Sequence, residues 1–209
     1  MTILDNYLRI KSEVKIYKDK KIIVVSKGQS IEKIKPLLES GHIDFGENRV
    51  QEAMTKWEDL RSQFNNSKLH LIGALQTNKA KEALSLFDYI HSLDNEKLAK
   101  ILSALENATQ KKIKYFIQVN LGQENQKRGI SDERLKDFIN YCHNDLKLNI
   151  IGLMCIPPDN QEPGFYFERL STLNKKFSLP ELSMGMSSDY KIALKHNATY
   201  LRIGRLIFS

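Results

Sequence analysis

The sequence predicts a single α/β domain built as a (β/α)8 barrel, similar in plan to a TIM barrel. Eight short apolar segments, rich in β-branched residues, alternate with amphipathic helical stretches, and the connections between them are short. This alternation is typical of a parallel sheet, and eight is the number of strands at which such a sheet closes into this barrel. A chain of 209 residues is long enough for one compact barrel.

The elements follow one another in a regular order along the chain. A helical pattern at about residues 2–15 precedes the first strand. The segments predicted as strands are 21–27, 42–48, 68–76, 88–94, 114–121, 148–158, 181–188 and 199–208. The helical stretches between them are 30–41, 48–64, 78–87, 95–109, 131–146, 164–177 and 188–198. No Pro/Gly/Ser-rich linker divides the chain, so we expect one domain over residues 1–209.

Composition excludes several classes of protein. The chain is 41% hydrophobic and 27% charged, and no apolar run approaches the ~20 residues needed to cross a bilayer. The N-terminus does not have the pattern of a signal peptide, so we expect a cytoplasmic protein with no membrane contact. The two cysteines and five histidines lack metal-ligand spacing, which predicts no metal site. The net charge is +7, but the basic residues are spread along the chain and mixed with acidic ones, so we expect no nucleic-acid partner.

The chemistry of a (β/α)8 barrel lies at the C-terminal ends of its strands. The first strand ends in Ser26-Lys27, and a lysine at the edge of a core can act as a nucleophile. The alternative is an ordinary solvated lysine. The second strand ends in Gly46-Glu47-Asn48, and the seventh ends in Met186 and two serines.

Arg202 lies in the last predicted strand, in the segment YLRIGRLIF. The two-residue period places it on the same face as Tyr200 and Gly204, opposite Leu201 and Ile203. If the Leu201 face packs against the helices, Arg202 points into the barrel. A buried guanidinium needs a partner, which is either an acidic side chain or a ligand.

The loops after the seventh and eighth strands are the usual phosphate site of this fold. Ser187 and Ser188 precede a helix that is predicted to begin near Asp189, and Gly204 allows a close backbone approach. Capping of that helix by Ser188 or Asp189 is the structural alternative. A reactive lysine, a phosphate cup and an arginine together suit pyridoxal 5′-phosphate (PLP).

Several motifs resemble those of the YggS/PROSC family of PLP-binding, PLP-homeostasis proteins. They are VVSK, FGENRVQE, IGALQTNK, HSLD, GLMCIPP, LSMGMSSDY and RIG, one near each of most strand ends, from about Lys20 to the C-terminus. The resemblance implies a barrel like the N-terminal domain of alanine racemase.

The resemblance also implies roles for individual residues. Lys27 would hold PLP as a Schiff base, and Asn48 would lie at the edge of the cofactor. Ser187, beside Met186, and the backbone at Gly204 and Arg205 would bind the phosphate. Arg202 would face the pyridine nitrogen. A carboxylate there would keep the nitrogen protonated, whereas an arginine cannot accept its proton.

The family resemblance implies a non-catalytic protein of intracellular PLP (vitamin B6) homeostasis, with PLP-dependent apoenzymes as partners and a monomeric state. The alternative is a PLP-dependent amino-acid racemase, which needs a base on each face of the substrate. In alanine racemase a tyrosine from another domain and the partner subunit supplies the second base. No tyrosine of this chain is predicted at the rim, so the carrier is the favoured function.

Overall fold

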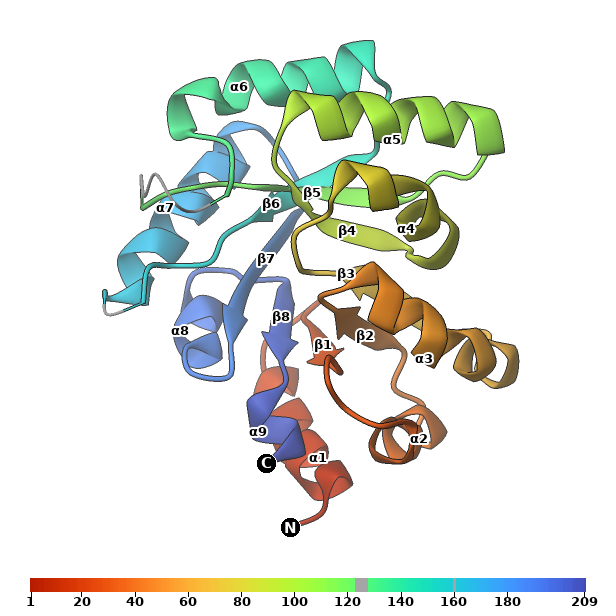
Figure 1. Ribbon diagram of the computed structural model, residues 1–209. Helices are drawn as coiled ribbons and strands as arrows, with labels where there is room; N and C mark the ends of the chain where they lie inside the picture. Colours follow the sequence, from red (N-terminus) through yellow and green to blue (C-terminus); the bar gives the residue numbers. More distant parts are fainter. Residues whose placement is uncertain (123–127, 160) are drawn as a thin grey trace.

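The computed structural model describes residues 1–122, 128–159 and 161–209, and within them it confirms the predicted closed barrel. Eight parallel strands pair in sequence order, and β8 returns to pair with β1 (Figure 1). The strands are β1 (Lys21–Val25), β2 (Asp44–Glu47), β3 (Lys68–Leu71), β4 (Tyr89–Leu93), β5 (Lys114–Gln118), β6 (Ile150–Met154), β7 (Glu181–Met186) and β8 (Tyr200–Ile203).

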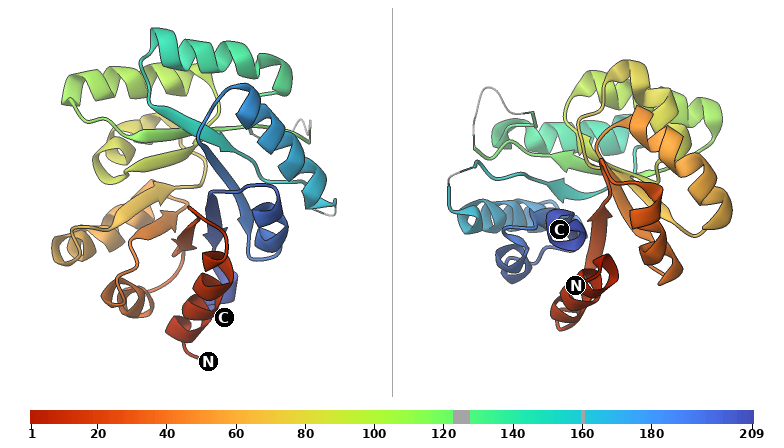
Figure 2. Two further views of the ribbon diagram at one scale, coloured as in Figure 1. Left: turned by 180° about the vertical axis from the view of Figure 1, so that it is seen from behind. Right: turned by 60° about the horizontal axis from the view of Figure 1, so that its bottom comes forward.

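Helices cover the outside of the strands. They are α1 (Ile3–Lys15), α2 (Ile31–Glu39), α3 (Val50–Gln63), α4 (Ala80–Leu86), α5 (Glu96–Thr109), α6 (Asp132–Asn140), α7 (Pro163–Lys176), α8 (Tyr190–Lys195) and α9 (Arg205–Phe208), with a 3-10 turn η1 (Thr77–Lys79) and a π-helical turn η2 (Tyr141–Asp145). The ring of helices around the strands is seen from three directions in Figures 1 and 2. No helix in the described ranges combines the length and the apolar character that crossing a membrane requires.

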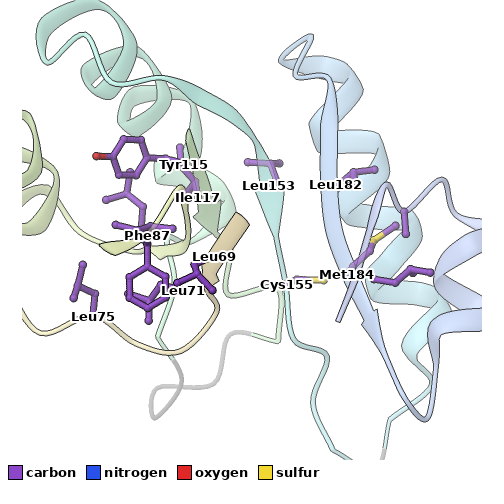
Figure 3. Packing of buried hydrophobic residues seen from close by; sticks show 14 of the residues in the cluster. Leu69, Leu71, Leu75, Phe87, Tyr115, Ile117, Leu153, Cys155, Leu182 and Met184 are labelled. Carbon is purple, nitrogen blue, oxygen red and sulfur yellow. The ribbon is translucent and has the colours of Figure 1, made fainter. Parts of the chain in front are cut away.

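Side chains that point outward from the strands build the main hydrophobic core. Ile22 and Val24 of β1 belong to it, and so do Leu201 and Ile203 of β8. Figure 3 shows other members of this layer, among them Leu153 of β6, which is fully buried. Because successive side chains of a strand point to opposite faces, the residues between these face the inside of the barrel.

The inside of the barrel holds a second, smaller apolar cluster. Its buried members are Ile23, Tyr89, Phe116, Met154 and Tyr200. Buried histidine rings stack on this cluster, His70 on Tyr89 and His91 on Phe116, each with ring centroids 4.2 Å apart. The barrel is therefore filled at this level by aromatic side chains and not by solvent.

The predicted strand 199–208 is correct only as far as Ile203, since residues 205–208 form α9. The apolar run Leu206–Phe208 is too short for its periodicity to distinguish a strand from a buried helical turn. Contacts from α1 favour the helix, because the Asn6 side-chain amide donates to the Ile207 and Ser209 carbonyl oxygens at 3.3 and 3.1 Å. The predicted first helix is confirmed, with Thr2 as its N-cap.

His42 is a buried histidine whose hydrogen bonds fit the neutral ring. Its Nε2 lies 2.8 Å from the Asp44 carbonyl oxygen, to which it must donate, so Nδ1 accepts from the Tyr7 hydroxyl at 2.9 Å. Burial lowers the pKa of His42 from 6.5 to about 4. The unfolded chain therefore binds this proton more tightly than the folded chain does.

We expect the free energy of unfolding to fall as the pH is lowered from about 6.5 towards 4, because protonation of His42 then favours the unfolded state. His42 alone should contribute about 3 kcal/mol to this fall, since one pKa unit corresponds to about 1.4 kcal/mol. Urea unfolding at a series of pH values measures it. His42→Gln should flatten the dependence relative to His143→Gln, which replaces an exposed ring. An identical pH dependence in the two variants would contradict this assignment.

Candidate functional site

The carboxyl ends of all eight strands meet at one rim, and a cavity of about 590 Å3 opens there. Its lining comes from segments at or beyond the ends of β1, β2, β3, β6, β7 and β8. The lining residues are Val25, Lys27, Gln29, Asn48, Ile72, Ile156, Met186, Ser187, Ser188, Arg202, Gly204, Arg205, Phe208 and Ser209.

All seven residues predicted from the sequence lie in this lining. They are Lys27, Asn48, Met186, Ser187, Arg202, Gly204 and Arg205. Sequence reasoning missed the apolar walls, such as Ile72 and Ile156. The signal for these two was present, because each stands two residues beyond an inward-facing residue, His70 in one case and Met154 in the other.

Lys27 stands two residues beyond the end of β1. Ile23 faces the barrel interior, and the two-residue period carries Val25 and Lys27 to the same side, where both line the cavity. Lys27 is exposed at the mouth of the cavity rather than held inside the core. Its amine forms no hydrogen bond or ion pair with any residue that the structure describes, which leaves the amine available to a ligand.

A buried carboxylate on the other side of the barrel wall holds the strand end that carries Lys27. Glu47 is fully buried. Its Oε1 accepts from the Ser26 hydroxyl at 2.7 Å, and from Lys56 Nζ and Trp57 Nε1 at 3.0 Å each. Lys56 is itself 9% exposed, so the two opposite charges compensate each other away from water.

The same network fixes the backbone on both sides of Lys27. The Lys56 ammonium also donates to the Ser26 carbonyl oxygen at 2.8 Å and to Glu52 Oε1 at 3.0 Å. Glu52 Oε1 in turn accepts from the Gly28 N–H at 2.6 Å, a bond that lowers the pKa of this carboxyl. Gly28 has a φ of +67°, which a glycine adopts without strain. The backbone that carries the lysine is therefore held on both sides by this network.

Arg202 lies at the inner end of the cavity, as its place in the strand predicted, and it is only 4% exposed. Its guanidinium donates to the Ser183 hydroxyl at 2.8 Å and to the Cys155 carbonyl oxygen at 2.9 Å. It forms no ion pair with a described residue, so the structural alternative of a directly paired arginine is wrong. Burial lowers the pKa of Arg202, yet a guanidinium stays protonated at neutral pH.

The turn after β7 does not cap α8 in the way that the sequence suggested. Asp189 is the N-cap residue, but its carboxylate accepts from the Met186 N–H at 2.5 Å and bonds to no amide of the helix. Burial raises the pKa of this carboxyl. Ser187 Oγ accepts from the Leu206 N–H at 3.3 Å, which leaves the Ser187 hydroxyl proton free to donate to a ligand.

The close approach of β1 requires a glycine at position 204. A Cβ at this position would lie 3.0 Å from the Val25 carbonyl oxygen and 3.1 Å from the Val25 Cβ. The absence of a side chain therefore lets the end of β8 approach the end of β1, and this contact adds to the predicted ligand approach. Arg205 follows directly, exposed and in the cavity lining.

The lining has a chemical character of its own. It combines the cations of Lys27, Arg202 and Arg205 with serine hydroxyls, and no described side chain in it is a carboxylate. The apolar lining residues Val25, Ile72, Ile156 and Phe208 offer surface for a hydrophobic ring. The site thus suits an anionic, partly apolar molecule with a group that reacts with an amine.

The fold and this cavity define the class of protein: a barrel whose rim cavity is lined by a lysine beyond the first strand and an arginine of the last strand. The alanine racemase N-terminal domain family matches residues 2–209. A pyridoxal phosphate homeostasis protein from Aquifex aeolicus is 37% identical over 199 residues, which cover 90% of this chain and 86% of that protein. One from Haemophilus influenzae is 35% identical over 198 residues, with 90% and 84% covered.

This chain belongs to the alanine racemase N-terminal domain family and, within it, to the pyridoxal phosphate homeostasis proteins. The structure of PipY from Synechococcus elongatus PCC7942, solved with PLP bound, is similar over the whole of both chains, with 31% sequence identity and a TM-score of 0.92. Alanine racemase from Acinetobacter baumannii has a TM-score of 0.77 at 13% identity, with 99% of this chain and 61% of that chain covered. This second likeness concerns the fold alone.

We expect Lys56→Met to lower the free energy of unfolding by about 3 kcal/mol, because it leaves the Glu47 carboxylate buried without its counter-ion. Urea denaturation of the ligand-free protein measures the change. Lys81→Met, which replaces an exposed lysine of α4, is the matched control and should change stability by less than about 0.5 kcal/mol. If Lys56→Met matches this control, the buried network does not support the Lys27 segment.

Proposed function

We propose that this protein binds PLP without catalysing a reaction on it and serves intracellular PLP homeostasis, with residues 1–209 forming one PLP-binding domain. The observation that carries the proposal is that Lys27, Arg202 and the Ser187 side of the rim line one cavity. Relatives that carry the name pyridoxal phosphate homeostasis protein and the PLP-bound PipY structure support it.

Each predicted residue has a role in this proposal. PLP supplies an aldehyde, and its condensation with the neutral Lys27 amine forms a C=N bond and releases one water. Ser187 donates its hydroxyl proton to the phosphate, and Gly204 and Arg205 meet the same group. Asn48 and Met186 border the ring of the cofactor.

Arg202 determines what the bound ring can do. Every polar hydrogen of a guanidinium is a donor, so Arg202 offers the pyridine nitrogen a hydrogen bond and cannot accept its proton. The nitrogen then remains unprotonated, and the ring withdraws electrons less strongly than a protonated pyridinium does. This arrangement suits storage of the cofactor.

The racemase alternative lacks its second base. No tyrosine, histidine, aspartate or glutamate side chain occurs among the described residues of the lining. Tyr89 and Tyr200 are buried in the interior cluster below the cavity. A positioned acid or base contributes typically 10²–10⁴-fold to a proton transfer, and this supports the carrier over the racemase.

The remaining parts of the proposal concern the surroundings of the protein. PLP-dependent apoenzymes are the proposed recipients of the cofactor, because an aldehyde at an open cavity mouth is accessible to a competing amine. We propose that the protein is a monomer, lies in the cytoplasm and binds neither nucleic acid nor a membrane.

We expect PLP added to the purified protein to give the visible absorption band of a Schiff base, with saturation at one PLP per chain. Lys27→Ala should abolish the band, whereas Lys33→Ala, an exposed lysine of α2, should leave it unchanged. Spectrophotometric titration of the three proteins measures this. A band of full strength in Lys27→Ala would overturn the assignment of the lysine.

A further inference from the structure

Five side chains form one continuous hydrogen-bonded chain through the inside of the barrel. Asp44 Oδ1 lies 3.0 Å from His70 Nε2, and His70 Nδ1 lies 3.0 Å from His91 Nε2. His91 Nδ1 lies 2.8 Å from Ser183 Oγ, which is 2.8 Å from Arg202 Nη1. The chain begins at the first residue of β2, at the N-terminal end of the barrel, and ends at the cavity.

The two ends of this chain fix the direction of every hydrogen bond in it. Arg202 has only donors, so Ser183 Oγ accepts from it. At the other end burial raises the pKa of Asp44, but the hydrogen bond from His70 and nearby positive charge, that of Lys68 included, together outweigh burial and lower it. The Asp44 carboxylate is therefore an acceptor, and His70 donates to it from Nε2.

The two histidines between these ends are neutral. Both rings are fully buried, and burial lowers the pKa of His70 and lowers that of His91 well below its ordinary value. Since His70 has its single proton on Nε2, its Nδ1 must accept from the Nε2–H of His91. His91 Nδ1 then accepts from the Ser183 hydroxyl.

Only this arrangement satisfies all the groups. If His91 had its proton on Nδ1 instead, its Nε2 lone pair would face the Nδ1 lone pair of His70. The Ser183 oxygen would then accept from both His91 and Arg202, and its own proton would lack a partner in the chain. Unsatisfied polar groups in a buried site cost free energy, which selects the single direction from Arg202 to Asp44.

We propose that Asp44, His70, His91 and Ser183 are positioning residues for Arg202, and that together they orient its guanidinium toward the ring nitrogen of the bound cofactor. This inference rests on the proposed function, in which Arg202 faces that nitrogen. The polarised chain links the buried guanidinium of Arg202 to the Asp44 carboxylate through hydrogen bonds, whereas Asp189 acts on Arg202 only through its charge and forms no hydrogen bond or ion pair with it.

Because Asp44 lies far from the cavity, the hydrogen-bonded chain can transmit a change at Asp44 to Arg202, which local packing around Arg202 could not do. The Asp44 side chain is 13% exposed and lies at the end of the barrel opposite the cavity. A change of its charge alters the hydrogen bonds of both histidines and, through Ser183, the acceptor of Arg202. Asp44→Asn, which keeps the shape but removes the charge, should therefore change ligand binding at the other end.

The first test uses the ligand-free protein with ¹⁵N-labelled histidine. NMR at pH 7 should show His70 and His91 neutral, each with its proton on Nε2. A proton on Nδ1 of either ring, or a charged imidazolium, would overturn the inference. This measurement does not depend on PLP binding, so it tests the direction of the hydrogen bonds even if the proposed function fails.

The second test compares PLP with its 1-deaza analogue, which has a carbon atom in place of the ring nitrogen. Ser183→Ala should weaken PLP binding roughly ten-fold, the effect of one hydrogen bond to a charged group, and leave the analogue unaffected. Ser183→Thr retains a hydroxyl and should restore most of the affinity for PLP. Ser103→Ala removes a buried hydroxyl that is not part of the hydrogen-bonded chain, and it is the matched control.

Two outcomes of this comparison would overturn the positioning role: equal losses for PLP and the analogue in Ser183→Ala, or unchanged binding of both. If Ser183→Ala does not fold, the same comparison in Asp44→Asn decides, with a loss selective for PLP expected. Failure of the unmodified protein to bind PLP would instead contradict the proposed function.

Discussion

Closure of the barrel between β1 and β8 is the constraint on which the site depends. The two strands run in parallel, with Ile23 opposite Arg202 and Val24 opposite Ile203. This pairing brings the first strand end, with its lysine, beside the last strand end, with its arginine. Gly204 permits the close approach, because any side chain there would press on Val25. The site therefore exists only in the closed barrel.

Two separate buried networks then support the two functional side chains. Outside the barrel wall, Glu47 and Lys56 hold the backbone that carries Lys27. Inside the wall, the hydrogen-bonded chain that starts at Asp44 reaches Arg202. Buried hydrogen-bonded networks are rigid, so the backbone that carries Lys27 and the guanidinium of Arg202 are held in place before a ligand arrives. The fold itself is shared with alanine racemases at 13% identity, so the function depends on the side chains in the cavity.

The sequence was sufficient to predict the order of the strands and the residues at their C-terminal ends, because both follow from alternation along a strand. It was not sufficient to predict α9, where a short apolar run after Gly204 fits a strand as well as a helix. The sequence was also not sufficient to predict the hydrogen-bond partners of Arg202. Ser183 comes from the neighbouring strand β7 and the histidines from β3 and β4, and only the register of the closed sheet brings them together. Their positions in the alternation along each strand predict that their side chains point inward, but not which side chains they contact.

In the proposed function, Lys27 is the residue that captures the aldehyde of PLP. The most direct measurement is reduction of the PLP-loaded protein with borohydride, whose hydride converts the C=N bond to a stable amine, followed by peptide mapping by mass spectrometry. We expect one pyridoxyl group per chain, on Lys27, with Lys56 and the exposed Lys33 unmodified. A pyridoxyl group on a different single lysine, or spread over surface lysines, would contradict it.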